Sequence, residues 1–353
     1  MSGSQATEAV AARFEAPDDL EAINRLYRDR RWSDGLPVVP PTVERVERML
    51  RHTRRARDEI VARIAPGFGA ATVERIAINA VLAGCDPEYL PALIAATEAS
   101  AAPEFNLQAM QATTNPVAIW VIVNGPAAKT LGVNGTYNCL GQGDWANATI
   151  GRALRLVLQN VGGALPGEMD RATQGQSAKF TCCCAENEDG SPWEPLHVER
   201  GFARDASTVT VVGAESFLNM NTHTKDAGEL IRSIAETIMH PPSNDYCHGG
   251  EPWIVFSPEH AEIFKRAGIS KAEVKRQLWE RSKMRASSMT ERDLLRIRDS
   301  RSGELGAIGP DTLLPVSHDP GGIQILVAGG PGTHSIYVPS FGNTQAVTRE
   351  FSL

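Results

Sequence analysis

The densest group of reactive side chains in this sequence lies in the segment 179–202, KFTCCCAENEDGSPWEPLHVERGF. Its three consecutive cysteines are accompanied by several carboxylates and one histidine. The β-prone start at 179–181 predicts a strand, in which Cys183 would face away from Cys182 and Cys184 because successive side chains alternate. We therefore expect one reactive thiol, Cys183, beside two that pack or coordinate. The alternative is that all three are small buried hydrophobes, as free cysteines often are.

A cysteine acts as a nucleophile when a neighbouring base or a positive dipole lowers the pKa of its thiol. Glu186 and His197 are close to Cys183 in sequence and could move its proton. His334 is a further candidate, because it follows the glycine-rich stretch 329–332, whose N–H groups could face an oxyanion. The sequence thus predicts an enzyme with Cys183, Glu186, His197 and His334 as catalytic candidates. A loop residue held by hydrogen bonds is the alternative for each histidine.

The same segment also offers ligands for a metal ion. Thiolate, imidazole and carboxylate groups bind zinc, iron or copper, and Cys182, Cys184 and His197 are the candidate ligands. No CxxC or HExxH spacing is present, so distant residues would have to complete the site. The cofactor remains open, with a metal-dependent enzyme as one alternative and a non-catalytic ligand-binding protein as a second.

Substrate contacts are expected on loops that follow strand-like apolar runs. NPVAIWVIVNGP at 115–126 and IQILVAGGPG at 323–332 are such runs, and a glycine-rich loop follows each. Backbone N–H groups at a helix start hold anions, and Arg152 could bind a carboxylate through two N–H groups. We expect a small polar, anionic substrate. Near Cys183 we expect the convergence of Asp34, Asn124, Asn147, Glu186, His334 and Asn343. Flexible loops and a surface ion pair of Arg152 are the alternatives. The predicted substrate-binding residues are Asp34, Asn124, Asn147, Arg152, Gly330, Gly332 and Asn343.

The elements around these residues predict an α/β protein. Residues 1–110 read as a helical N-terminal region with a proline-rich strap, WSDGLPVVPPT, at 32–42. Residues 111–353 read as an α/β catalytic region whose strand–loop–helix units form a mixed or parallel sheet. The two apolar runs end alike, which suggests an internal duplication with half-repeats of about 111–240 and 250–353.

Helix boundaries are indicated by caps and apolar spacing. One helix is expected over 19–30, after a polar lead-in. Thr42 should cap a long helix over 43–64, because a threonine side chain accepts a bond from a free N–H group at a helix start. A third helix is expected over 72–83, with Gly84 as its stop.

Composition restricts the partners. The 353 residues carry a net charge of −7, so nucleic acid is not expected, and no run of 18 apolar residues predicts a membrane span. The first residues lack a basic start and an apolar core, and six cysteines in this arrangement are expected to be free thiols or ligands in the cytoplasm. The Ala-rich helices over 72–100 offer more small apolar surface than one partner needs, which predicts a homo-oligomer.

Several longer motifs are similar to those of one bacterial protein family. DGLPVVPPT, VNGP, CxAENE with SPWEPLHVERGF, and VAGGPGTHS resemble an uncharacterised family that is loosely associated with thiol- and selenocysteine-containing proteins. The resemblance covers nearly the whole chain. It carries no established activity and implies only that the thiol of Cys183 matters.

Overall fold

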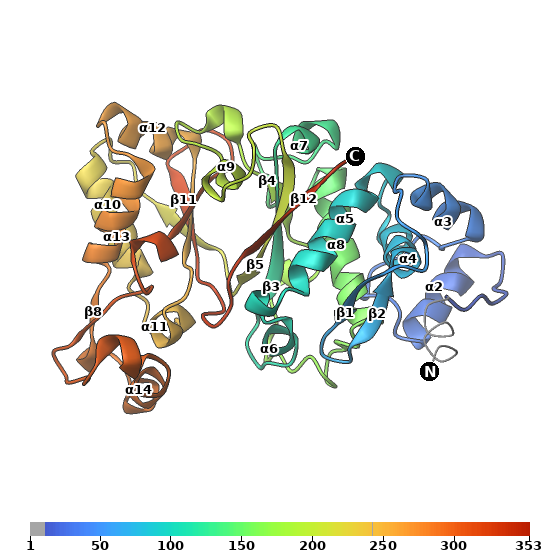
Figure 1. Ribbon diagram of the computed structural model, residues 1–353, viewed down its shortest axis with the longest axis horizontal. Coiled ribbons are helices and arrows are strands. Elements are labelled where there is room, and N and C mark those ends of the chain that lie inside the picture. The colour runs from blue at the N-terminus through green and yellow to red at the C-terminus, as the bar shows by residue number, and fades with distance from the viewer. Residues whose placement is uncertain (1–10, 242) are drawn as a thin grey trace.

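Two four-stranded sheets pack face to face between two groups of helices in the computed structural model, which describes residues 11–241 and 243–353 (Figure 1). The predicted α/β class is therefore confirmed, with mixed sheets of parallel and antiparallel strands. The first ten residues of the predicted lead-in lie outside the described residues. Among the helices described, none is both long enough and apolar enough to cross a membrane.

The first sheet has the strand order β12-β5-β3-β4. Its central strand β3 pairs in parallel with β4 and antiparallel with β5, and β12 pairs antiparallel with the other edge of β5. The strands are β3 (Ala118–Asn124), β4 (Cys183–Ala185), β5 (Ser207–Ala214) and β12 (Val347–Phe351).

The second sheet repeats this pairing pattern with the order β10-β7-β11-β6. Strand β7 takes the position of β3, so the topological counterpart of the first apolar run is β7 rather than β10. The two sheets exchange one edge strand each. Strand β6 follows β5 of the first sheet in the chain but pairs with β11 of the second. Strand β12 follows β11 of the second sheet but pairs with β5 of the first. The strands are β6 (Leu218–Asn221), β7 (Trp253–Phe256), β10 (Gln324–Val327) and β11 (His334–Val338).

The facing surfaces of the two sheets form one apolar layer. Trp120 of β3 and Trp253 of β7 are fully buried there and contact edge to face, with ring centroids 5.7 Å apart. Alternate residues of β3, such as Val121, face the helices instead. Strand β3 is therefore buried on both faces, as its unbroken apolar run predicted.

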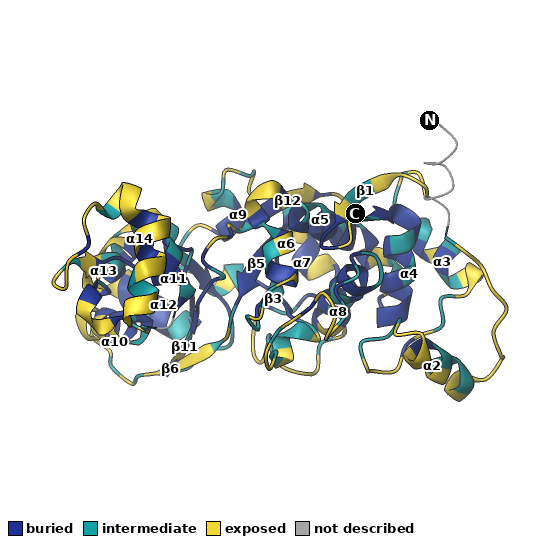
Figure 2. Ribbon diagram, turned by 90° about the horizontal axis from the view of Figure 1, so that it is seen from below, coloured by how far each residue is buried: buried dark blue, intermediate teal, exposed yellow. Residues whose placement is uncertain are grey.

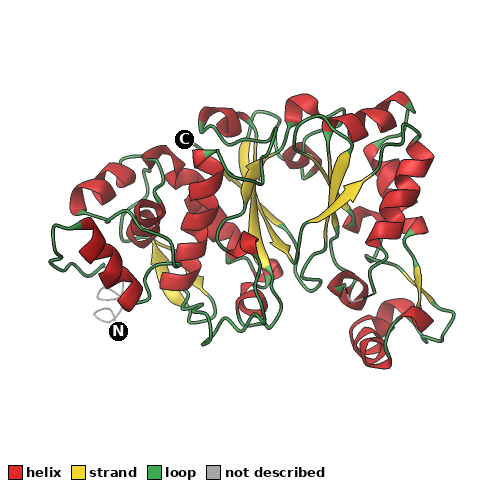
Figure 3. Ribbon diagram, turned by 180° about the vertical axis from the view of Figure 1, so that it is seen from behind, coloured by secondary structure: helices red, strands yellow, loops and turns green. Residues whose placement is uncertain are grey.

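Helices cover the outer face of each sheet, so the molecule has four layers (Figure 3). The covering helices are α4 (Val73–Ala83), α5 (Leu90–Ser100), α8 (Trp145–Asn160), α10 (Ala227–Ile238), α12 (Pro258–Arg266) and α13 (Lys271–Arg281). The other helices are α2 (Leu20–Asp29), α3 (Val43–Leu50), α6 (Leu107–Gln111), α7 (Pro126–Thr130), α9 (Leu196–Glu199), α11 (Asn244–His248) and α14 (Glu291–Leu305). Two small antiparallel two-stranded sheets comprise β1 (Ile60–Ile64) with β2 (Gly69–Thr72), and β8 (Met284–Arg285) with β9 (Leu313–Leu314). The 3-10 turns are Pro87–Tyr89, Pro103–Phe105, Ser177–Lys179, Glu188–Gly190, Ala286–Ser288 and Pro320–Gly322.

The helix predicted over 43–64 is wrong in its second half. Thr42 does cap α3 by accepting a bond from the N–H group of Arg45, but α3 ends at Leu50. Residues Ile60–Ile64 form β1 because their backbone pairs with β2, a partner that helical spacing cannot reveal. The helix α4 ends at Gly84 in the left-handed region, with φ of 89°, as predicted.

The N-terminal helices belong to the core of the first sheet. Most residues of α4 and α5 are buried within this chain, and α5 packs on β5 and β12 (Figure 2). Their apolar surface is therefore already covered, which removes the argument for a homo-oligomer. Helices α10, α13 and α14 instead expose one side to solvent.

Candidate functional site

The three consecutive cysteines alternate across β4 as predicted. Cys182 and Cys184 face the second sheet, whereas Cys183 faces the helices of the first. All three side chains are buried. The strand therefore separates the thiols into two environments, and each must be judged by its own neighbours.

The environment of Cys183 favours the neutral thiol. Its side chain is 3% exposed, and burial raises the pKa of its thiol, with a further rise from the nearby Cys85. The predicted proton-transfer groups, Glu186 and His197, cannot accept the proton of Cys183. They lie on the opposite side of β4 and of the loop that follows β4. The activation that the predicted role of Cys183 requires is thus not provided by its neighbours.

The thiol of Cys139 has a lowered pKa. Cys139 lies in the glycine-rich loop between α7 and α8, beside Cys184. A hydrogen bond from the Cys184 thiol lowers the pKa of Cys139, and the N–H groups of Gly329 and of Cys139 itself act in the same direction against burial. The same contact raises the pKa of Cys184. Of the six cysteines, Cys139 is the one whose pKa is lowered.

Two glycine-rich loops meet above this pair, as expected for loops at the carboxyl ends of their strands. The N–H group of Gly329 donates to the carbonyl of Gly135 over 2.9 Å. A Cβ atom at Gly330 would lie 2.1 Å from the Tyr137 ring, and one at Gly135 would lie 2.7 Å from the carbonyl oxygen of Ala185. The close approach of the two loops therefore depends on glycine.

A row of polar side chains crosses the first sheet at the same end. Thr208 lies opposite Asn124 in the β5–β3 pairing, and Glu186 comes directly after β4. Oxygen Oε2 of Glu186 accepts bonds from Asn124 Nδ2 over 2.6 Å and from Leu196 N over 2.7 Å. Oxygens Oε1 of Glu186, Oδ1 of Asn124 and Oγ1 of Thr208 are buried without a partner among the described residues.

Burial is the main influence on Glu186, whose side chain is almost completely enclosed. It raises the pKa of Glu186 to about 7, against the opposing effects of Lys271 and of the two N–H donors. A carboxyl group with a pKa near neutrality can accept and release protons at working pH. Glu186 is also two residues beyond Cys184 on the same face of the sheet, so the carboxyl group and the thiol pair share one side.

His197 lies at the border of this row, on α9. Its side chain is fully buried, Nε2 is 3.2 Å from the carbonyl oxygen of Arg204, and Nδ1 has no hydrogen-bond partner in the described chain. Nδ1 is 3.8 Å from Oε1 of Glu188, which accepts bonds from Asn124 Nδ2 and from the N–H group of Gly125. Asn124, Glu186 and His197 therefore lie close together at this end of the sheet.

Asp34 and Arg152, which were predicted to contact a substrate, pair with each other. Arg152 is the eighth residue of α8, and its guanidinium donates to both oxygens of Asp34, over 2.7 and 2.9 Å, and to the carbonyl of Pro37 over 2.8 Å. The carboxylate of Asp34 therefore neutralises the guanidinium of Arg152, which was predicted to bind an anionic substrate. The pair fastens the proline-rich strap to α8.

The remaining predicted residues have different surroundings. Asn147 accepts from the N–H group of Asn134 over 2.8 Å and donates to the carbonyl of Cys139 over 2.9 Å, so it supports the Cys139 loop. His334 is exposed on β11, with Nδ1 3.1 Å from Asn219 Oδ1. Gly332 accepts a bond from Ser257. Asn343 is exposed and accepts from Asn106 through its carbonyl, so neither His334 nor Asn343 joins Cys183.

The predicted metal ligands do not form a binding group. Within residues 11–241 and 243–353, no three His, Cys, Asp or Glu side chains are placed to hold a metal ion. Cys182 and Cys184 share a face, but His197 lies beyond Glu186 and is turned towards Arg204 and Glu188. The set Cys182, Cys184 and His197 is therefore not supported as a metal centre.

Sequence reasoning had considered Cys139 only as a distant ligand for a metal. The available signal was its place inside a loop with glycines at 132, 135, 141 and 143. Comparisons with protein-family models, with curated proteins and with solved structures found no match to this chain. The functional conclusion therefore depends on the geometry described above.

Proposed function

We propose that this protein is a cysteine-dependent enzyme, a thiol–disulfide oxidoreductase in which Cys139 is the attacking thiol and Cys184 its resolving partner. The observation that carries this proposal is the contact between the thiol of Cys139, in the loop between α7 and α8, and the thiol of Cys184 in β4. The N–H groups of Gly329 and Cys139 support it, because both lower the pKa of Cys139. Six free cysteines suit a reducing compartment, and we propose a cytoplasmic location.

The reaction proceeds by two exchanges. The Cys139 thiolate attacks one sulfur of a small disulfide, so that a mixed disulfide forms and one thiolate of the substrate leaves. Cys184, after loss of its proton, attacks the sulfur of Cys139 and expels the second thiolate. Two electrons have then passed to the substrate, which leaves as two thiols, and the Cys139–Cys184 disulfide is reduced again by a small external thiol.

Glu186 supplies the proton acceptor that Cys184 needs. Its carboxyl group lies on the same side of the sheet as Cys184, and its Oε1 atom has no hydrogen-bond donor among the described residues. A carboxylate in this position can take the thiol proton directly or through one water molecule. Asn124 and the N–H group of Leu196 hold the other oxygen and so orient the group.

Disulfide formation in redox buffers tests the proposal. Full-length protein is equilibrated with mixtures of reduced and oxidised glutathione, quenched with acid, alkylated and digested for mass spectrometry. We expect a single internal disulfide between Cys139 and Cys184. Recovery of both residues as free thiols under every oxidising condition would refute the pair.

Reduction of bis(2-hydroxyethyl) disulfide with dithiothreitol as the electron source tests turnover. Cys139→Ala and Cys184→Ala should each lower the rate at least 100-fold, whereas Cys247→Ala, a buried cysteine of the second sheet's core, should leave it unchanged. The variant Cys183→Ala distinguishes the present proposal from the sequence-based prediction that Cys183 is the reactive thiol. Loss of activity in Cys183→Ala with normal activity in Cys139→Ala would return the reactive role to Cys183.

A further inference from the structure

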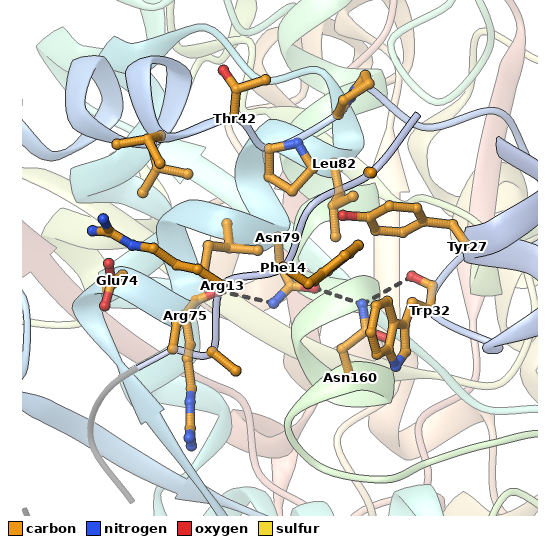
Figure 4. A pocket seen from close by; sticks show the side chains of 18 of the residues that line it. Arg13, Phe14, Tyr27, Trp32, Thr42, Glu74, Arg75, Asn79, Leu82 and Asn160 are labelled. Carbon is orange, nitrogen blue, oxygen red and sulfur yellow. Dashed lines mark hydrogen bonds between the residues drawn. The ribbon is translucent and has the colours of Figure 1, made fainter. Parts of the chain in front are cut away.

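A cavity lies away from the thiols, between α2, α3, α4 and residues 11–18 (Figure 4). Its volume is about 670 Å³, which is within the usual range for small-molecule sites of roughly 300–1,000 Å³. Pro40 and Pro41 of the proline-rich strap form part of its wall. The cavity therefore accounts for a sequence motif that the thiol site does not use.

The strap is held in place by the last half of α8. Gln159 Nε2 donates to the carbonyls of Arg31 and Ser33 over 3.1 and 2.9 Å, and Asn160 Nδ2 donates to the carbonyl of Trp32 over 3.1 Å. The Arg152 pair described above adds a further attachment. Because prolines also restrict the strap, this wall is formed before any ligand arrives, which lowers the entropy lost on binding.

Aromatic and aliphatic side chains dominate the lining. Trp32 contacts Phe14 and Tyr27, with ring centroids 5.7 and 5.6 Å apart, and Ile78 and Leu82 of α4 also line the cavity. Such flat surfaces contact ring systems over a large area. The occupant that fits these walls is an apolar molecule that contains rings.

Some of the charged groups at the cavity are paired with one another. Arg57 forms ion pairs with Glu47 and Glu74, and Arg75 donates to the carbonyl of Ala70. Figure 4 shows Glu74 and Arg13 on one side of the cavity and the Tyr27 and Trp32 rings on the other. On the aromatic side, the guanidinium of Arg30 lies over the Phe14 and Trp32 rings, with its Cζ atom 5.1 and 4.9 Å from the ring centroids. A cationic ligand would be repelled there, so an uncharged molecule suits the site better than an amine.

One polar group on the aromatic side remains available. The Tyr27 hydroxyl has no hydrogen-bond partner among the described residues and points towards the space between the labelled side chains. The Tyr27 side chain is otherwise buried, and this burial raises the pKa of its hydroxyl, which therefore stays protonated. A protonated hydroxyl can donate a hydrogen bond to a ligand oxygen.

We infer that this cavity binds an uncharged, apolar ring compound whose carbonyl oxygen accepts a hydrogen bond from Tyr27. The binding is independent of the thiol chemistry, because it uses the strap, α2 and α4 rather than the strand ends. Fixed aromatic walls give affinity for the rings, and the single hydroxyl gives orientation.

Nile red is a suitable probe, since it is uncharged, polycyclic and carries one carbonyl group. Its fluorescence should rise and shift to shorter wavelength on binding to the full-length protein, with saturation at one dye per chain. Ile78→Trp places a larger side chain in the cavity and should abolish binding without lowering the melting temperature by more than a few degrees. Equal binding to wild type and to Ile78→Trp would overturn the assignment to this cavity.

The hydroxyl is tested with Tyr27→Phe, which keeps the ring. Loss of a neutral hydrogen bond should weaken Nile red binding about 2- to 10-fold. Tyr137→Phe, which removes an exposed hydroxyl outside the cavity, is the matched control and should bind as wild type does. Identical affinities of the two variants would refute the hydrogen bond, and tighter binding of the anionic dye 1-anilinonaphthalene-8-sulfonate than of Nile red would refute the preference for an uncharged ligand.

Discussion

The burial of Glu186 makes a quantitative prediction about stability and pH. The variant Glu186→Gln keeps the shape of the side chain, and its amide oxygen can still accept from Asn124 Nδ2 and Leu196 N. The substitution therefore removes the ionisable group and little else.

The magnitude follows from the pKa. Burial raises the pKa of Glu186 from the ordinary 4.5 to about 7, so the folded state binds a proton that the unfolded state has already released. The stability from this group is fully present below pH 4.5 and is lost as the pH rises through 7. A pKa difference of one between the folded and unfolded states corresponds to 1.36 kcal/mol, so the loss of stability at pH 8.5 is about 3 kcal/mol.

Unfolding in urea at pH 5 and pH 8.5 measures this effect. The free energy of unfolding of Glu186→Gln minus that of wild type should be about 2.5 kcal/mol more positive at pH 8.5 than at pH 5, because part of the loss has already occurred at pH 5. In a chain of 353 residues, this corresponds to a relative gain of about 3 °C in melting temperature. Burial also raises the pKa values of Glu215 and Asp245 to about 7. Their contributions to the pH dependence of stability are the same in variant and wild type, so they cancel in the difference.

The control is Glu236→Gln, at an exposed position on α10. Its difference from wild type should be the same at both pH values within about 0.5 kcal/mol. A pH-independent difference for Glu186→Gln would refute the reasoning, because it would mean that Glu186 ionises as readily in the folded chain as in the unfolded one.

Three further substitutions test the scaffold through urea or thermal unfolding. Arg152→Ala should lose about 3 kcal/mol, because it leaves the carboxylate of Asp34 buried without its partner, whereas the exposed Arg349→Ala should change stability by less than about 0.5 kcal/mol. Gly125→Ala should destabilise by more than about 2 kcal/mol, since its φ is +79° and a Cβ atom would lie 2.0 Å from the carbonyl of Ala206. Gly303→Ala, in α14 with open space around the position, should instead gain up to about 1 kcal/mol. A stable Gly125→Ala protein, or an unchanged melting temperature in Arg152→Ala, would contradict the respective contact.

Local features of the chain were readable from the sequence. The cap at Thr42, the stop at Gly84, the buried strand β3 and the alternation of Cys182, Cys183 and Cys184 all depend on residues within a few positions of one another. Cap preferences, the special freedom of glycine and the two-residue period of a strand act at that range. They are properties of the local backbone and need no distant partner.

Long-range partners decided the rest. Cys139 and Cys184 are 45 positions apart in sequence, Arg152 meets Asp34 over 118 positions, and β12 returns from the end of the chain to pair with β5. A thiol's pKa depends on burial and on the donors around it, so no spacing rule could single out Cys139 or rule out Cys183. The sequence by itself determined which residues could react and which segments would form strands and helices. Only the tertiary structure determined which thiols meet, because the pairing of strands and the packing of loops bring together atoms that the chain keeps far apart.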